Sequence, residues 1–181
     1  MKKLMRNLLG AVALATVAST AHAIPVHVTY TADNVTDFAI ACIIPTGPAS
    51  CGAGTSAALG ANYDDWTLAD TFTLDLNPGA YWFSFKVRNV GGASTGNPGA
   101  FLAEISGGAW GDLLTSSAWQ VDRDRPTLFP STQDVWDSAT EYGANGVGPW
   151  GTIAGISTSA NWIWDSTNTE GAEFITVRGR V

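Results

Sequence analysis

Residues 135–164 read VWDSATEYGANGVGPWGTIAGISTSANWIW. Four of the eight tryptophans of the chain lie in this segment, separated by glycines and small polar residues. Each glycine inside a helix destabilises that helix by about 1 kcal/mol relative to alanine, so this segment cannot sustain one. The pattern therefore predicts strands and loops that hold the aromatic side chains in an all-β framework.

Alternation of apolar and polar residues predicts strands elsewhere in the chain. Residues 26–30, 72–76 and 81–87 all alternate in this way, and the turn at 77–79 between the last two predicts a hairpin with one buried face. Further strands are expected at 101–105, from 119, at 161–164 and at 173–181. A short helical turn is expected only at 138–142. About eight short strands with glycine- and proline-rich turns predict a single antiparallel β-sandwich of jelly-roll type.

The first 23 residues have the pattern of an export signal. Cations at positions 2–6 precede the apolar run 8–18, and Ala-His-Ala at 21–23 is a small-x-small cleavage site. The apolar run is shorter than the roughly 20 residues that a membrane-spanning helix needs. We therefore expect cleavage after Ala23, no membrane insertion, and a periplasmic or extracellular β-sandwich domain of residues 24–181.

The mature chain predicted in this way is strongly acidic. The leader contains three of the nine Lys and Arg residues and none of the sixteen Asp and Glu residues, so its removal leaves a net charge of −10. Proteins bind phosphate backbones mainly through Lys and Arg. Nucleic acid and anionic membranes are therefore not expected as partners.

The two cysteines, Cys42 and Cys51, flank a turn-rich insert. In an oxidising compartment such a pair predicts a structural disulfide, with two buried free thiols as the alternative. A bridge that closes so short a loop stabilises a protein by about 2–3 kcal/mol at most. It would make one loop rigid and would not hold the whole domain together.

Seven short motifs follow one another over nearly the whole mature chain. They are TADN (31–34), LNPG (76–79), FSFKVRN (83–89), GAFLAEI (99–105), DVWDSA (134–139), PWG (149–151) and ANWIW (160–164). In this order they resemble the galactose-binding-domain-like β-sandwiches, jelly rolls found as accessory modules beside rhamnosidase and β-galactosidase catalytic domains. One departure is the stretch 132–136, which has one acid where the family often has two. The resemblance implies a jelly-roll fold and does not identify a ligand.

A structural calcium ion is a second implication of the resemblance, because jelly-roll modules of this kind often contain one. Oxygen ligands on loops suit Ca²⁺, and the best local cluster is Asp64 and Asp65 with Asn62. Asp33 with Asn34 is the next candidate, followed by Asp122 with Asp124. Solvated surface acids are the alternative interpretation of each cluster.

The tryptophans are the main sign of a binding function. Aromatic faces stack on the apolar faces of sugar rings, although tryptophan more often buries most of its area in a core. Trp66, Trp110 and Trp150 lie in glycine-flanked, turn-rich stretches and are, with Tyr142, the candidate ligand contacts. The side chains expected to pack internally are Trp136, Trp162 and Trp164, and Trp82 is expected to cover the outer face of a sheet.

The residues needed for catalysis are scarce. The mature chain has one histidine, His27, within a predicted strand. It therefore has too few side chains for a nucleophile–base pair and too few ligands for a zinc site. A pair of carboxylates could hydrolyse a glycoside, but the spacing selects no two of the candidates Asp64, Asp65, Glu104, Asp134, Asp137 and Glu141. We therefore expect a protein that is not an enzyme.

These observations lead to two hypotheses about function. The first is a secreted carbohydrate-binding module that acts on a glycan or polysaccharide at a cell surface or in an extracellular matrix. The second is a structural component of an envelope, matrix or appendage that assembles by self-association. The low lysine content and the many glycines suit both hypotheses.

Overall fold

The computed structural model describes residues 22–43, 54–123, 136–169 and 174–181. Strands, turns and loops make up these residues, and no helix occurs among them. Sheet A contains β1 (Ile24–Asp33), β4 (Asp70–Leu76), β6 (Ala100–Gly107), β7 (Leu113–Leu114), β10 (Thr140–Ala144) and β11 (Asn161–Trp164). Sheet B contains β2 (Val35–Ile43), β3 (Gly54–Ala57), β5 (Tyr81–Arg88), β8 (Gln120–Asp122), β9 (Asp137–Ser138) and β12 (Phe174–Arg180).

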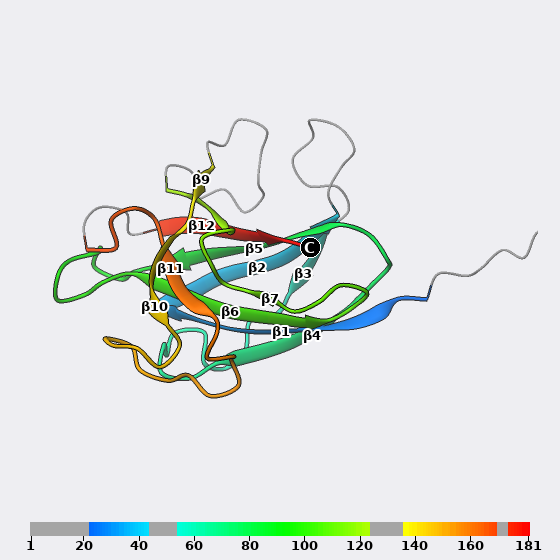
Figure 1. Cartoon of the computed structure of the whole chain (residues 1–181), viewed down its shortest axis with the longest axis horizontal. Helices are drawn as coiled ribbons and strands as arrows, with labels where there is room; N and C mark the ends of the chain where they lie inside the picture. The colour runs from blue at the N-terminus through cyan, green and yellow to red at the C-terminus, as the bar shows by residue number, and fades with distance from the viewer. Residues whose placement is uncertain (1–21, 44–53, 124–135, 170–173) are drawn as a thin grey trace, which may run out of the picture.

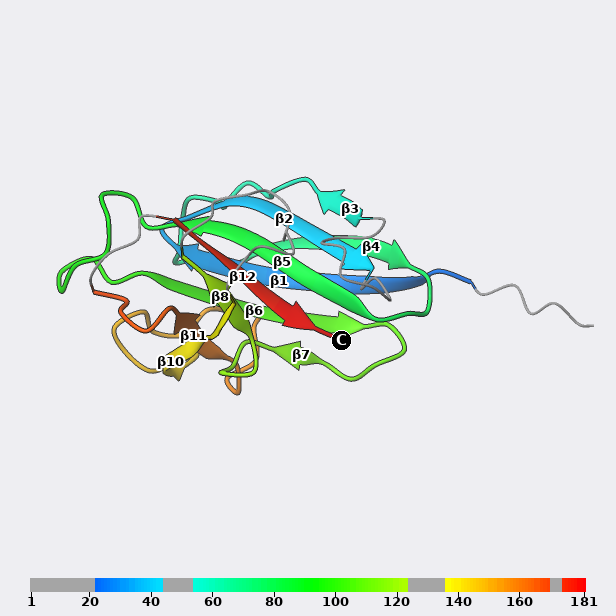
Figure 2. The ribbon, with the colours of Figure 1, turned by 90° about the horizontal axis from the view of Figure 1, so that it is seen from above.

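The two sheets pack face to face as a sandwich, seen in two views (Figure 1, Figure 2). The order of strands is β10-β11-β6-β1-β4 in sheet A, with β7 paired to β6, and β3-β2-β5-β12-β8-β9 in sheet B. The strand pairs described in both sheets are antiparallel. The predicted all-β antiparallel sandwich is confirmed.

The core between the sheets is built on residues that alternate along the strands. Val28 and Tyr30 of β1 are buried, whereas His27 is exposed, as the sequence pattern predicts. Phe85 of β5 lies at the centre of an aromatic cluster, with its ring 5.5 Å from Tyr30 and 4.8 Å from Phe101 of β6. This cluster joins the two sheets by the burial of large apolar rings, the main favourable contribution to folding.

The predicted hairpin between residues 72–76 and 81–87 is wrong. β4 pairs with β1 in sheet A, and β5 pairs with β2 and β12 in sheet B. The turn between them therefore crosses from one sheet to the other, and the Tyr81 hydroxyl group donates a hydrogen bond to the Asn77 carbonyl oxygen at 2.8 Å. Both strands have an apolar face, and both faces are buried in the core between the two sheets.

The helical turn expected at residues 138–142 is also not formed. Ser138 ends β9, and Glu141 and Tyr142 belong to β10, which pairs with β11. The backbone N–H of Ala139 donates to the carbonyl oxygen of Trp119 at 2.8 Å. The backbone groups of residues 138–142 are satisfied by pairing with other strands. The sequence of these five residues alone does not reveal that pairing.

The outer face of sheet B has a layer of aromatic and cationic side chains. The Arg178 guanidinium lies 4.2 Å from the ring centroid of Trp82 and 3.6 Å from that of Trp136. Trp82 covers this face as predicted, but Trp136 is partly exposed here and does not belong to the core. Trp162 and Trp164, in contrast, are fully buried, which confirms them as packing residues.

Two predictions fall on residues that the structure does not describe. Residues 1–21, which contain most of the predicted leader, lie outside the described ranges. Cys51 lies outside them too, and only the backbone of Cys42 is described, so their disulfide stays a prediction. Among the described residues, no helix is long and apolar enough to cross a membrane.

A glycine in β12 makes room for a buried tryptophan. An alanine Cβ at Gly179 would lie 2.4 Å from Cε2 of Trp119, and that ring is held by a hydrogen bond from Nε1 to the Leu114 carbonyl oxygen at 2.9 Å. We expect Gly179→Ala to lower the free energy of unfolding by about 2 kcal/mol through overpacking. Thermal unfolding should show a loss of about 6 °C.

Gly111→Ala is the matched control, because no atom lies within 4 Å of its added Cβ and the residue is exposed. Its melting temperature should stay within about 1 °C of the wild type, since an isolated surface substitution changes stability little. Equal melting temperatures of the two variants would contradict the packing described for Trp119.

Candidate functional site

Residues 145–160 cover the part of the outer face of sheet A that β6 and β11 form (Figure 1). Leu102 of β6 and Trp162 of β11 point toward this face, while Phe101 and Ile163 beside them belong to the core between the sheets. A second hydrophobic cluster forms here from Ala100, Leu102, Trp150, Ile153, Ile156, Ala160 and Trp162. Sheet A is therefore buried on both faces at β6 and β11, whereas β1 and β4 keep exposed side chains such as His27 and Thr73 on the outer face.

A single buried amide organises that loop. Asn145 Nδ2 donates to the carbonyl oxygens of Ile153 and Ile156 at 3.0 and 2.8 Å, and its Oδ1 accepts from the N–H of Ile153 at 2.7 Å. The N–H of Ser157 donates to the carboxylate of Glu104 at 2.6 Å, which ties the loop to β6. These bonds satisfy backbone groups that have no strand partner.

Trp150 connects this loop to β11 and to the end of β1. Its ring stacks on Trp162 at 5.0 Å between centroids, and its Nε1 donates to Asp33 Oδ2 at 2.9 Å. The side chain is only 5% exposed. A turn-rich, glycine-flanked stretch favours an exposed side chain. For Trp150 this prediction is wrong, because the loop folds back over sheet A and buries the ring.

The loop between β5 and β6 forms a neighbouring wall. Asn97 Nδ2 donates to Asn89 Oδ1 and to the Val90 carbonyl oxygen, and Asn89 Nδ2 donates back to the Asn97 carbonyl oxygen at 2.8 Å. The N–H of Val90 donates to Oδ1 of Asn34 at 3.0 Å, which connects this loop to the turn between β1 and β2. Reciprocal amide bonds of this kind hold an irregular loop in one conformation.

These loops meet at the end of the sandwich where β1 finishes and β6 begins, and they border an open cavity of about 230 Å³. The residues that line it are Asp33, Asn34, Trp66, Gly96, Asn97, Pro98, Pro149 and Trp150. Two indoles, two amides and one carboxylate therefore come together from four separate segments of the chain. We call this space the loop-end cavity.

Asp33 dominates the electrostatics of the loop-end cavity. Its side chain is largely buried, and burial raises the pKa of the carboxyl group, an effect only partly opposed by the hydrogen bond from Trp150. A carboxylate whose charged form is disfavoured by desolvation, at the wall of a cavity, is typical of a functional site.

Trp66 is the second predicted residue that reaches the loop-end cavity. It is half-buried, packs against the second hydrophobic cluster, and is fixed through its carbonyl oxygen, which accepts a bond from the Thr31 hydroxyl group at 3.0 Å. The structure thus brings Trp66 and Trp150 together, although they are 84 positions apart in the chain.

The predicted calcium ligands lie in the same loop as Trp66. Asp65 Oδ1 accepts bonds from the N–H and hydroxyl groups of Thr67, the Asn62 amide donates to the Ala69 carbonyl oxygen, and Asp64 is exposed. Within the described ranges, no three His, Cys, Asp or Glu residues are grouped closely enough to hold a metal ion. The calcium site stays a prediction.

Trp110 lies at the opposite end of the sandwich. It follows the far end of β6, and its ring packs against Tyr81 at 5.9 Å between centroids. Because the loop-end cavity adjoins the first residue of β6, Trp110 takes no part in it. Its indole is half-buried, like that of Trp66.

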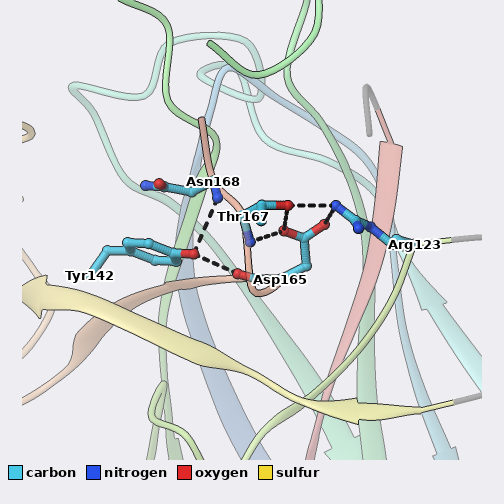
Figure 3. A network of polar contacts seen from close by, with 5 residues as sticks. All are labelled: Arg123, Tyr142, Asp165, Thr167 and Asn168. Carbon is cyan, nitrogen blue, oxygen red and sulfur yellow. Dashed lines mark hydrogen bonds and ion pairs between the residues drawn. The ribbon is translucent and has the colours of Figure 1, made fainter. Parts of the chain in front are cut away.

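Tyr142 belongs to a polar network with residues 165–168, which follow β11 in the chain (Figure 3). Its hydroxyl group donates to the Asp165 carbonyl oxygen at 2.7 Å and accepts from the N–H of Asn168 at 3.1 Å. The Asp165 carboxylate pairs with Arg123 at 2.7 Å and accepts from the N–H of Thr167 at 2.8 Å. Tyr142 therefore anchors the chain after β11 and does not line the loop-end cavity.

Arg123 and Asp165 also line a second cavity, of about 410 Å³. Its other lining residues are Val121, Asp137, Ser138 and Ser166. The two charged groups already satisfy each other across 2.7 Å. Among the described residues this cavity has no aromatic lining, in contrast to the loop-end cavity.

The candidate catalytic groups are dispersed or already engaged. His27 is exposed on β1, where Nδ1 lies 3.0 Å from the Thr73 hydroxyl group. The carboxylates of Glu104 and Glu141 accept bonds from backbone N–H groups of Ser157 and Ser117. Asp134, which belongs to a motif of the resemblance, lies outside the described residues.

Three comparisons with known proteins give no relative. No family model, no curated protein and no solved structure matches the chain. The interpretation of the site therefore rests on its residues and geometry.

The role of Asn145 can be tested by its removal. Asn145→Ala leaves at least three buried backbone groups without a partner, and each such group destabilises a fold by about 1–3 kcal/mol. We expect a loss of about 3 kcal/mol in the free energy of unfolding, with a reduced near-ultraviolet circular dichroism signal from the tryptophans. Asn77→Ala, in an exposed turn, should change neither quantity, and equal effects of the two variants would contradict the role of Asn145.

The burial of Asp33 predicts a pH-dependent stability. Because the pKa is raised in the folded state, the folded protein binds this proton more tightly than the unfolded chain, and stability falls as pH rises from about 3.9 through the raised pKa. Asp33→Asn removes the charge and keeps an acceptor for Trp150. Its melting temperature should exceed that of the wild type by more at pH 7 than at about pH 3.

Asp64→Asn is the control for this experiment, since it removes the same charge from an exposed residue. Its melting temperature relative to the wild type should not rise between about pH 3 and pH 7 as that of Asp33→Asn does. If Asp33→Asn raised the melting temperature by the same amount at both pH values, the charged form of Asp33 would not be disfavoured by burial.

Proposed function

We propose that this protein is a secreted, non-catalytic carbohydrate-binding module with a galactose-binding-like jelly-roll fold, and that the loop-end cavity is its ligand site. The observation that carries the proposal is the meeting of Trp66 and Trp150 with a buried carboxylate and two asparagine amides in one cavity. The export pattern of residues 1–23 supports a site of action outside the cytoplasm.

The chemistry of this lining suits a sugar ring. Hydroxyl groups both donate and accept hydrogen bonds, and the carboxylate of Asp33 together with the amides of Asn34 and Asn97 supplies both kinds of partner. The C–H faces of a sugar are apolar and pack on aromatic surface. The half-buried Trp66 provides this surface, while the buried Trp150 holds the Asp33 carboxylate at the cavity wall. The volume of about 230 Å³ lies below the range of about 300–1,000 Å³ typical of sites for drug-sized ligands, so it suits a single ring at a chain end.

The surface around the cavity supports a larger ligand beyond that ring. Four large apolar side chains are prominent on the described surface: Tyr63, Leu68, Val90 and Val147. They belong to the three loops that contribute Trp66, Asn97 and Trp150 to the cavity lining. A polysaccharide chain that extends from the cavity over these loops would contact such exposed apolar side chains.

Isothermal titration calorimetry with methyl glycosides of common hexoses, deoxyhexoses and hexosamines tests the proposal. At least one should bind, and Trp66→Ala should weaken it about tenfold or more, which corresponds to about 1.4 kcal/mol. Trp110→Ala removes an equally half-buried indole from the opposite end of the sandwich and should leave the affinity unchanged. Equal losses from both variants, or no binding by folded protein, would contradict the proposal.

The same four exposed side chains also favour a second candidate function, assembly of the protein with further copies of itself. An apolar surface at one end of the molecule would then contact another copy instead of a glycan. Light scattering over a range of protein concentrations separates the two. Multimers that dissociate in the variants Val147→Ser and Leu68→Ser would favour assembly. A monomer at all concentrations would favour glycan binding.

A further inference from the structure

Asp33 is unusual among the buried carboxylates that the structure describes. Asp165 pairs with Arg123 at 2.7 Å and accepts a bond from a backbone N–H, and Asp70 accepts bonds from the N–H of Asn62 on both of its oxygens. Asp33 is as deeply buried, at 7% exposure, yet its described contact is one bond from the neutral Trp150 indole. The ion pairs found within the described ranges, Arg88–Asp37 and Arg123–Asp165, do not include it.

The residues that line the loop-end cavity with Asp33 provide no positive charge to pair with its carboxylate. Its neighbours in the loop-end cavity are indoles, amides, prolines and a glycine, and none of them is basic. Buried carboxylates in proteins are normally paired with a cation or hydrogen-bonded several times over. Because the unpaired carboxylate lies at the wall of a cavity, a cationic group of a ligand can reach it there.

The aromatic lining favours the same kind of group. Indole is the strongest of the aromatic side chains in attracting an ammonium ion, and both Trp66 and Trp150 line the cavity beside the carboxylate. An anionic sugar such as a uronate would be repelled by Asp33 and would find no compensating cation in the cavity lining. The negative charge of Asp33 therefore disfavours acidic ligands, and both this charge and the two indoles favour ligands with a protonated amine.

We propose that the loop-end cavity selects an amino sugar with a free, protonated amine, whose ammonium group pairs with Asp33. The inference rests on the proposed function and assigns its ligand class. A glucosamine-type residue at the end of a deacetylated polysaccharide combines the two required features, a ring for the tryptophans and a positive charge for the carboxylate.

Three sugars of one ring shape test the inference: glucosamine, N-acetylglucosamine and glucose, which differ in having an ammonium, acetamide or hydroxyl group at one carbon. Calorimetry at about pH 6, where the amine is protonated, should show glucosamine binding at least tenfold more tightly than either neutral sugar. In Asp33→Asn the ratio of the glucosamine affinity to the N-acetylglucosamine affinity should fall to about one. Asp64→Asn, with the same loss of charge on an exposed residue, should keep the ratio of the wild type.

The outcomes separate this inference from the function on which it rests. Equal binding of all three sugars by the wild type, or a preference for the amine that survives in Asp33→Asn, would overturn the amino-sugar assignment and leave sugar binding standing. No binding of any sugar would overturn both. Ethanolamine that binds as tightly as glucosamine, or calcium ions that abolish the preference by occupying the cavity, would show that Asp33 recognises a cation and not the ring.

Discussion

The hydrogen bond from the Trp150 indole to the Asp33 carboxylate joins residues 117 positions apart in the chain. It connects the loop over the outer face of sheet A to the end of β1, and through the stack of Trp150 on Trp162 it connects that end to the second hydrophobic cluster. The loop-end cavity exists because these parts are held in place together. The same bond holds the carboxylate of Asp33 at the wall of the loop-end cavity, where burial disfavours its charged form.

The sequence predicts the strands better than it predicts their partners. Burial on one face of β1 or β5 follows from a local period of two residues, so both strands can be recognised. The residues after β4 can either turn back beside it or cross to the other sheet, and only the packing of two apolar faces selects the crossing. Trp136 and Trp162 are both predicted to pack internally, but Trp136 packs under Arg178, 42 positions away. No feature of the sequence near Trp136 indicates this contact.

The site was only partly predictable for the same reason. Trp66 and Trp150 can be identified as candidates from their turn-rich surroundings, yet Trp110 shares that signal and lies at the other end of the molecule. Asp33 and Asn34 draw attention as adjacent oxygen ligands, which suggests a metal, whereas in the structure each is engaged by a different loop. Asn97 and Asn145 have no distinctive motif. Their importance comes from loop closure, which brings together segments that the sequence separates.

Two-dimensional ¹H–¹⁵N spectra resolve the indole N–H signals of individual tryptophans, and each can be assigned with a tryptophan-to-phenylalanine variant. Titration of the folded protein with glucosamine is the most direct test of the loop-end cavity as the ligand site. The signals of Trp66 and Trp150 should shift and saturate together, with the same dissociation constant, while those of Trp110 and Trp82 stay unchanged. Shifts confined to Trp110 or Trp82, or no shift of any indole signal, would contradict the account.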